Sequence, residues 1–514
     1  MLQTSIRQQV FITLFISLFL ISCGTAKKIT SSDDGKIEIA ILQMNDVYEI
    51  SGVDGGKIGD LSRVATVYKE LKQENPQTMM VLAGDFLNPS LVGTMRYEGE
   101  RIRGRQMIEV LNAMGLDMVA FGNHEFDISE ADLQKRINES KFEWLATNIQ
   151  QVCGNKEYPF YREVNGKKQF LPESKVMNFT DADGTPLRLG VFSAVINSNP
   201  VDFVHYYNAD SMVNLTLQDL KPKSDVIIGL THLSMEEDMA LAQKYQSVPL
   251  IMGGHEHDHM YHNVGKSIVA KADANAKTVY IHRLTYNTKS GATKVTSELK
   301  VIDEEIKRDE ATAAIVDKWK KVLEDQVKEI VDDPYEIVYT ADEALDGRES
   351  SMRHRQTNMG SIFAAAFLNS SVKGAEAAIF NSGSVRIDDQ LSGAIMAIDI
   401  FRALPFGGSV YDIEMKGSLL KGVLRFSEKE KGKGAFLQTS GITGSNGDWM
   451  VNGQKIDDDR IYKIAITDFL LRGLDIPFLT EKNEGIMSID KPVSANDLRS
   501  DLRKAIIAYM KKQK

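Results

Sequence analysis

The stretch that decides the fold is Gly122-Asn123-His124-Glu125-Phe126-Asp127, which places an amide, an imidazole and carboxylates within six residues. It follows the apolar run at residues 118–121, the pattern of a buried strand, so its polar side chains are expected where that strand ends. In open α/β sheets, ligands gather outside the carboxyl ends of the strands. An Asn-His pair after a strand can also cap a helix or bind loop backbone, so the stretch alone leaves both interpretations open.

Four further apolar runs end in the same kinds of side chain. Two precede Asp46 and Asp85, one precedes His232, and one precedes the pair His255 and His257. Oxygen and imidazole donors without cysteine suit zinc, manganese or cobalt, with iron also compatible. The number of donors indicates two divalent ions, and two ions about 3.5–4 Å apart need a bridging carboxylate, for which we choose Asp85. The predicted metal donors are Asp46, Asp85, Asn123, His232, His255 and His257.

These strand ends resemble the calcineurin-like metallophosphatase domain, and specifically its branch in bacterial 5'-nucleotidases. The resemblance implies an α/β fold whose N-terminal domain is a four-layer α/β/β/α sandwich. It also implies one ion held by Asp46, Asp85 and His257, and a second ion held by Asp85, Asn123, His232 and His255. The expected reaction is hydrolysis of a nucleotide phosphoester by a metal-bound hydroxide, because metal coordination lowers the pKa of water from about 15.7 to about 7.

The resemblance gives His124 a catalytic role instead of a place among the ligands. In the family, the residue matching His124 stabilises charge on the phosphoryl group or on the leaving oxygen. The residue matching Asp127 orients the imidazole ring, as a carboxylate does in other sites.

One position departs from the family pattern of Asp-x-His after the first strand, because this chain reads Asp46-Val47-Tyr48. A phenolate can coordinate a metal, particularly trivalent iron, but a metal must first lower its pKa from about 10. Alternatively, Tyr48 only packs and the first ion has fewer protein ligands. We favour packing, and the metal preference is the property that this substitution affects most.

Residues 353–360, 381–386 and 404–408 resemble the C-terminal substrate-binding domain of 5'-nucleotidases. The middle motif departs from the family's Asn-Gly-Gly-Gly-Ile-Arg, since Ser382 and Ser384 replace glycines and Val385 replaces isoleucine. The loop therefore keeps its asparagine and arginine but loses some backbone freedom. Residues 468–475 resemble the element that supplies a second aromatic ring and a carboxylate.

A nucleotide offers a flat base, a diol and phosphate, so its pocket needs rings, a carboxylate and arginines. Two aromatic rings that clamp a base each contribute about 1–3 kcal/mol by stacking. The planar fork of an arginine can bind two phosphate oxygens at once. We assign the base to Phe406 and Phe469, the ribose hydroxyls to Asp475, a polar edge to Asn381, and phosphate to Arg353 and Arg386. Without the resemblance, a phenylalanine beside proline and glycine is more often a loop anchor in a core.

The N-terminus has the form of a bacterial lipoprotein signal. Residues 1–23 contain Arg7, an apolar run over residues 10–21 and then Cys23. The apolar run is short for a bilayer span, which needs about 20 residues. A lipidated Cys23 would tether the protein to the bacterial cell envelope, on the periplasmic side or at the outer membrane. Only Cys153 would then remain, so no intramolecular disulfide can form.

The length and net charge of the chain limit the possible number of domains and the classes of substrate. With 514 residues and 43% hydrophobic composition the chain can form two domains, because single cores stop growing at about 250–300 residues. The formal charge of −10 and the lack of a long Lys/Arg tract argue against nucleic-acid polymers as substrates, whereas single nucleotides remain compatible.

The predicted parts are a signal peptide at 1–23, a flexible tether at 24–36, a catalytic domain at 37–303, a linker helix within 304–334 and a smaller α/β substrate-binding domain at 335–514. The sequence carries no signal for a particular oligomeric state.

Several alternatives stay open at this point. The same metals could serve a 2',3'-cyclic nucleotide, a dinucleotide or a nucleotide sugar. The alternative from another class is a surface nucleotide-binding lipoprotein with impaired catalysis, which Tyr48 and the altered loop at 381–386 motivate. In the resembled family the domains rotate about the linker, whereas a rigid two-domain body is the simpler alternative. A hinge would predict that few contacts cross the domain boundary.

Overall fold

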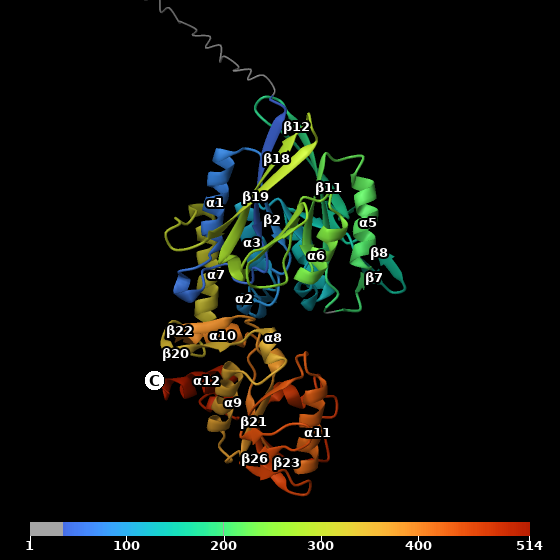
Figure 1. The fold of residues 1–514 in the computed structure, drawn as a ribbon. Helices are drawn as coiled ribbons and strands as arrows, with labels where there is room; N and C mark the ends of the chain where they lie inside the picture. Colours follow the sequence, from blue (N-terminus) through green and yellow to red (C-terminus); the bar gives the residue numbers. More distant parts are fainter. Residues whose placement is uncertain (1–33, 199, 514) are drawn as a thin grey trace, which may run out of the picture.

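The computed structural model describes residues 34–198 and 200–513, and the predicted signal peptide, Cys23 and most of the tether lie outside them. Figure 1 shows an N-terminal domain, coloured blue to yellow, and a smaller C-terminal domain, coloured orange to red, stacked end to end. The predicted two-domain α/β fold is confirmed. Strand β1 (Lys36–Met44) begins at the last residue assigned to the tether. Among the described residues, no helix combines the length and the apolar character needed to cross a bilayer.

Two sheets, each of six strands within the described residues, form the centre of the N-terminal domain. The first has the order β19 (Ala292–Val301), β18 (Thr278–Asn287), β1, β2 (Thr78–Ala83), β5 (Met118–Ala120) and β6 (Glu143–Leu145). The second has the order β11 (Ser174–Thr180), β12 (Pro186–Val195), β14 (Val226–His232), β15 (Leu250–Met252), β17 (Ser267–Lys271) and β16 (Met260–Val264). Apolar side chains of both sheets, including Ile39, Val81, Leu189 and Ile228, pack into one buried layer between them.

Helices cover the outer face of each sheet, which gives the predicted α/β/β/α layers. The first sheet packs against α1 (Leu61–Glu74), α3 (Arg105–Met114) and α4 (Glu130–Glu139), and α7 (Glu310–Val327) packs on α1 and α3. The second packs against α5 (Ala209–Leu220) and α6 (Met235–Lys244). Because both faces of the sheets are covered, β2 and β14 are buried at every residue and read as continuous apolar runs.

The direction of the strands brings the polar segments together. Strands β1, β2, β5 and β6 are parallel neighbours in the first sheet, and β12, β14, β15 and β17 are parallel neighbours in the second. Parallel strands end at the same edge of a sheet, so the loops that follow them meet there. Figure 1 shows the C-terminal domain packed against the same end of the N-terminal domain.

The C-terminal domain has a central sheet with the order β24 (Leu437–Ser440), β21 (Ala377–Asn381), β28 (Ile461–Thr467), β23 (Val410–Lys416) and β29 (Ile486–Asp490). Helices α9 (Asn358–Ser370), α11 (Gly417–Lys429) and α12 (Leu502–Lys511) pack against it. Short helices α8 (Glu349–Met352) and α10 (Ala397–Ala403) and the pair β20 (Ile337–Asp346) and β22 (Gln390–Met396) lie nearest the N-terminal domain (Figure 1).

Contacts of two kinds cross the boundary between the domains. Lys277 pairs with Asp389 at 2.8 Å, and Arg402 pairs with Glu49 at 3.4 Å. One apolar cluster also continues from the helical layer of the N-terminal domain into the C-terminal domain. The boundary of this closed arrangement is therefore not the sparse contact that a free hinge predicts.

The carboxylate of Glu125 joins the loops that follow β2 and β5. It is fully buried and accepts hydrogen bonds from the amides of Asp85, Phe86, Leu87 and Gly122, at distances of 2.8, 2.8, 3.1 and 2.7 Å. Burial and the Asp85 carboxylate raise the pKa of Glu125, whereas these amide bonds lower it. The backbone of Asp85 is therefore fixed by a side chain from the neighbouring loop.

Replacing Glu125 with alanine should lower the free energy of unfolding by about 3 kcal/mol or more, because each buried amide left without an acceptor costs about 1–3 kcal/mol. Urea unfolding of the metal-free protein measures the loss. Glu98→Ala is the control, since this glutamate makes an exposed pair with Arg105 whose loss should change stability by less than about 1 kcal/mol. Equal stability of the Glu125 variant and the parent would contradict the bridging role.

Candidate active site

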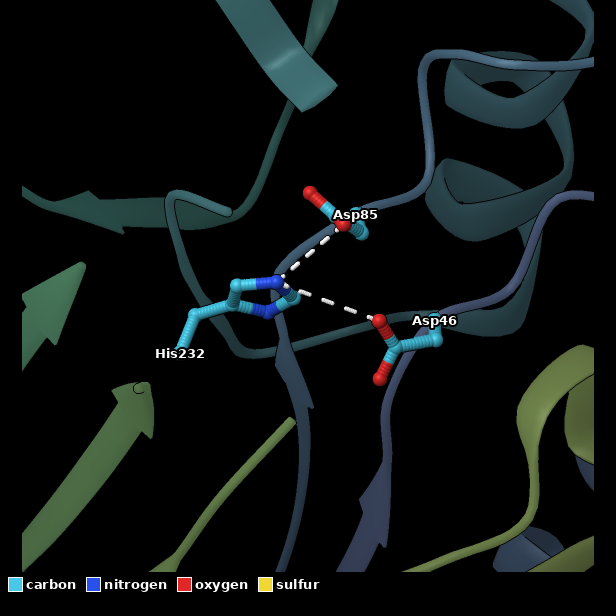
Figure 2. A group of neighbouring side chains, drawn as sticks. All are labelled: Asp46, Asp85 and His232. Atoms are coloured by element: carbon cyan, nitrogen blue, oxygen red, sulfur yellow. Dashed lines mark ion pairs between the residues drawn. The ribbon is translucent and has the colours of Figure 1, made fainter. Parts of the chain in front are cut away.

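Asp46, Asp85 and His232 form a compact buried group where three strands end. Their ligand atoms all lie within 4.8 Å of one another. Nε2 of His232 is 3.1 Å from Oδ2 of Asp85 and 3.9 Å from Oδ1 of Asp46, and Figure 2 shows it facing both carboxylates. Asp46 follows β1, Asp85 follows β2, and His232 is the last residue of β14.

The hydrogen bond on the other ring nitrogen sets the tautomer of His232. Nδ1 lies 2.7 Å from the carbonyl oxygen of Ala83, which can only accept, so Nδ1 carries a proton. Burial lowers the pKa of His232, but the charges of Asp85 and Asp46 outweigh it and raise the pKa to about 10. The space between Nε2 and the two carboxylates therefore holds either a proton or a cation.

Unpaired atoms in this region fit a bound metal ion. Among the described residues, neither Nε2 of His232 nor Oδ1 of Asn123 has a hydrogen-bond partner of acceptable geometry, although both are buried. Buried polar atoms without partners are rare and call for an ion or another ligand. A set of carboxylate, amide and imidazole donors suits divalent metals of the first transition row. The residues present thus fit the predicted metal ions.

The remaining predicted donors lie around the same group. Nε2 of His257 is 3.7 Å from Oδ1 of Asp46, and the ring of His255 lies 5.5 Å from that of His232, measured between centroids. The amide of His255 donates to Oδ2 of Asp46 at 3.0 Å. Asn123 is buried after β5, and its neighbour His124 donates its amide to Oδ1 of Asp85 at 2.8 Å. The predicted donors thus gather in one region.

Strained backbone holds these donors in place. Asp46, Asp85 and His255 adopt φ angles of +52°, +56° and +84°, which non-glycine residues adopt rarely. Gly254 lets the chain pass close to the site, because a Cβ there would lie 2.3 Å from the carbonyl oxygen of Ala83 and 2.7 Å from Nδ1 of His232. Such strain persists only where surrounding structure enforces it, and it concentrates at functional sites.

Tyr48 does more than pack against the site. Its hydroxyl oxygen lies 3.2 Å from Oδ2 of Asp85, 3.5 Å from Oδ1 of Asp46 and 3.1 Å from Nε2 of His257. Burial and the charges of Asp85 and Asp46 raise the pKa of Tyr48 well above its ordinary value, so in this arrangement the phenol keeps its proton. The side chain that replaces the family histidine thus points its polar atom at the predicted ligands of the first ion.

His124 and Asp127 form a pair beside the metal donors. Nδ1 of His124 is 2.7 Å from Oδ2 of Asp127, which also accepts from Nδ2 of Asn88 at 3.2 Å and from Nη2 of Arg386 at 3.1 Å. Burial lowers the pKa of His124, but the charge of Asp85 and the bond to Asp127 raise it to about 9. The bond to Asp127 therefore favours the imidazolium form, in which Nε2 also carries a proton.

The predicted substrate residues fall into two groups. Nδ2 of Asn381 donates to Oδ2 of Asp475 at 2.8 Å, and Oγ of Ser384 donates to Oδ1 of Asn381 at 2.6 Å, so a serine that replaces a family glycine supports this pair. Phe406 is 56% exposed, and the guanidinium of Arg386 lies 6.0 Å from its ring centroid. Phe469 is half-buried in the short helix η5 (Asp468–Leu471), and among the described residues no ring contact joins it to Phe406.

Four residues to which the sequence assigned no role contact these groups. Glu125 and Asn88 support the loops after β5 and β2, and both follow predicted site residues closely in the chain. Glu349 pairs with Arg353 and lies 3.8 Å from Nη1 of Arg386. Asp388 accepts from His257 across the domain boundary. No local pattern indicates Glu349 or Asp388, because their contacts with Arg386 and His257 arise only in the tertiary structure.

Comparison with known proteins agrees with this geometry. Residues 39–259 match the family model of calcineurin-like phosphoesterases, and residues 337–481 match that of the 5'-nucleotidase C-terminal domain. The 5'-nucleotidase of Bos taurus is 24% identical over 511 residues, covering 85% of this chain and 83% of that protein. The trifunctional nucleotide phosphoesterase protein YfkN of Bacillus subtilis is 26% identical, covering 88% of this chain and 33% of that protein.

The fold is also that of a solved relative. The crystal structure of the 5'-nucleotidase precursor from Thermus thermophilus superposes with a TM-score of 0.67 at 19% identity, covering 93% of this chain and 97% of that chain. Both domains and their order are therefore shared with that protein. The chain is therefore a metal-dependent phosphohydrolase in which a calcineurin-like phosphoesterase domain is followed by a 5'-nucleotidase C-terminal domain, and it is similar over most of its length to 5'-nucleotidases.

Proposed function

We propose that the protein is a 5'-nucleotidase, which hydrolyses a nucleoside 5'-monophosphate to the nucleoside and phosphate. The observation that carries the proposal is the meeting of three groups at the domain boundary. The buried group of Asp46, Asp85 and His232 lies next to the pair of His124 and Asp127, and Arg386 of the other domain contacts that pair. Metal donors, a proton donor and a phosphate-binding group are thus available to one phosphoester.

Two divalent ions, zinc, manganese or cobalt with iron also compatible, would be held by Asp46, Asp85, Asn123, His232, His255 and His257. Asp85 would bridge them, since its carboxylate faces both His232 and Tyr48. When bound, such ions activate a water as nucleophile and neutralise charge on the phosphoryl oxygens. The hydroxyl of Tyr48 would donate to the carboxylate of Asp85, and its oxygen lies beside Nε2 of His257, the atom that would face an ion.

His124 acts on the phosphoryl group through its free Nε2–H. Asp127 accepts the proton of Nδ1, which orients the ring and stabilises its imidazolium form, and Asn88 and Arg386 hold Asp127 in turn. An imidazolium directed at oxygens that gain negative charge stabilises the transition state more than the ground state. It also supplies the proton that the leaving oxygen of the nucleoside needs.

The C-terminal domain selects the nucleotide. Phe406 and Phe469 would stack on the base, Asp475 would accept from the ribose hydroxyls, and Asn381 would hold Asp475 through their 2.8 Å bond. Arg386 and Arg353 would bind the phosphate. Glu349 contacts both arginines in this arrangement, so substrate phosphate would take over part of its charge pairing.

A second candidate is a wider activity on nucleotide phosphoesters, including 2',3'-cyclic nucleotides. The name of the Bacillus subtilis relative, a trifunctional nucleotide phosphoesterase, favours it. The ions held by the predicted donors would act on the phosphoryl group and not on the base or the sugar. The site is therefore compatible with either ester.

The protein is also proposed to be an envelope lipoprotein, tethered through Cys23 after removal of residues 1–22. The N-terminal sequence supports this proposal. Mass spectrometry of the mature N-terminus is the direct measurement. An unmodified Cys23, or a leader peptide that is still present, would overturn the proposed lipid anchor.

Protein stripped by a chelator should release no phosphate from AMP, and addition of zinc, manganese or cobalt should restore release. Phosphate is measured for the 5'-monophosphates, and chromatography detects products from 2',3'-cyclic AMP and from a nucleotide sugar. A preference for the 5'-monophosphates supports the first candidate, and comparable rates on the cyclic ester support the second. Lack of turnover with every metal on every ester would contradict both candidate functions.

His124→Ala should lower kcat by about 100- to 10,000-fold, the range for loss of one general acid or base. Metal content, measured by mass spectrometry of the purified protein, should stay at the parent value because His124 is not a ligand. His259→Ala is the matched control, since that histidine is half-exposed and pairs with Asp273 outside the site. Parent turnover in metal-loaded His124→Ala would refute the catalytic role.

Phe406→Ala should raise KM for AMP by about 5- to 150-fold, which corresponds to a stacking energy of about 1–3 kcal/mol. Hydrolysis of glycerol 2-phosphate, which has no base, should be unchanged. The control is Phe170→Ala, because Phe170 has a similar exposure of 59% in β10 (Lys167–Phe170) of the other domain. An unaltered KM for AMP would remove Phe406 from the base pocket.

A further inference from the structure

The imidazole of His257 is held by a residue of the other domain. Nδ1 of His257 lies 3.1 Å from the carbonyl oxygen of Asp388 and 3.2 Å from Oδ2 of the same residue. His257 follows β15 in the N-terminal domain, whereas Asp388 lies between η4 (Ser382–Ser384) and β22 in the C-terminal domain. Both neighbouring atoms are acceptors, so Nδ1 carries the proton and Nε2 keeps the lone pair that a metal ion requires.

The position of Asp388 is itself fixed. Its backbone has a φ of +40°, in the left-handed region, and its Oδ1 accepts from the amide of Glu349 at 2.5 Å. Glu349 begins helix α8, so the carboxylate is held by a second segment of its own domain. With its side chain 30% exposed, Asp388 is only partly accessible to water, and the facing side chain of His257 is 15% exposed.

The same loop contacts the N-terminal domain through three charged side chains. Arg386 reaches Asp127 at 3.1 Å, Asp388 reaches His257, and Asp389 pairs with Lys277 at 2.8 Å. The arginine proposed to bind phosphate is thus two residues away from the carboxylate that holds a predicted metal donor. A movement of this loop would change both contacts together.

We propose that Asp388 is a positioning residue for the metal centre, which couples retention of the ion on His257 to docking of the C-terminal domain. The inference rests on the proposed function in that His257 must be a ligand. The second N–H of His257 donates to the carbonyl oxygen of Asp388, which fixes the tautomer and orientation of the ring, and the adjacent carboxylate makes the ring a stronger donor to the metal. Supplied from another domain, that carboxylate is present only when the domains are closed.

Thermodynamic linkage gives the coupling a second consequence. Phosphate bound at Arg386 stabilises the loop in its docked position, and the docked loop holds His257. Phosphate and metal should therefore each raise the affinity of the protein for the other by the same factor. Phosphate also contacts the bound ions directly, so part of this coupling is independent of Asp388, and the part that passes through Asp388 is the part lost in Asp388→Asn.

The test compares Asp388→Asn with Asp389→Asn in the full-length, metal-free protein. Asparagine has the size of aspartate and tolerates the left-handed backbone, so the first variant removes the negative charge beside Nδ1 of His257 and keeps the backbone carbonyl that accepts from Nδ1. The second variant removes the ion pair to Lys277 in the same loop and leaves His257 untouched. Mn²⁺ affinity is measured by competition with a chelator, first alone and then with inorganic phosphate.

Asp388→Asn should weaken binding of one Mn²⁺ ion by about 10-fold, the lower end of the range for loss of such a partner. Inorganic phosphate should tighten Mn²⁺ binding in the parent and in Asp389→Asn, and less so in Asp388→Asn. Parent affinity in Asp388→Asn would overturn the proposal. An equal loss in Asp389→Asn would also overturn it, because general loosening of the boundary would then explain both.

A double-mutant cycle with His257→Ala separates direct from indirect action. Asp388→Asn should have no further effect on Mn²⁺ affinity in the His257→Ala background, because the ring it positions is gone. A further loss there would show that Asp388 acts elsewhere and would overturn the proposal. These measurements need no turnover, so their failure is distinct from failure of AMP hydrolysis, which is measured on the parent protein.

Discussion

Two carboxylates buried side by side are the constraint on which the rest of the site depends. Asp46 and Asp85 are almost completely shielded from water and lie within 4.8 Å of His232 and of each other. Buried like charges repel and lose hydration, so this arrangement requires positive charge between them. The imidazole held by Ala83, the facing phenol of Tyr48 and the amide oxygen of Asn123, which has no partner among the described residues, are consistent with that requirement. The fold meets it by ending parallel strands of two sheets at one place.

Residues of both domains contribute to the same site. The N-terminal domain provides the predicted metal donors and His124, whereas the C-terminal domain provides charged groups that contact Asp127 and the predicted donor His257. Arg386 contacts Asp127 and Asp388 contacts His257, so both of these side chains have a partner across the boundary. A substrate that binds between the domains therefore meets groups whose geometry depends on how the domains are packed.

Much of the site could be predicted because its signal is local. A buried strand reads as an apolar run, and a polar residue directly after it must lie at the strand end, which identified Asp46, Asp85 and His232 as neighbours. The prediction that Tyr48 only packs missed its hydroxyl contacts, because sequence gives no direction for a side chain in a loop. The roles of Glu349 and Asp388 depend on contacts with Arg386 and His257, which lie far from them in the chain. The serines in the loop at 381–386 were interpreted as a loss of freedom, whereas Ser384 supplies a hydrogen bond to Asn381.

The left-handed backbone at Asp46, Asp85 and His255 has a consequence for how the protein responds to its surroundings. Strain and charge repulsion at this place weaken the empty protein, and a ligand that binds only the folded state adds about 2.7 kcal/mol when its concentration is about 100 times its Kd. The supply of transition metal around the cell then sets not only how fast the protein works but how much of it survives proteases. When the metal ion is scarce, the protein would be degraded faster.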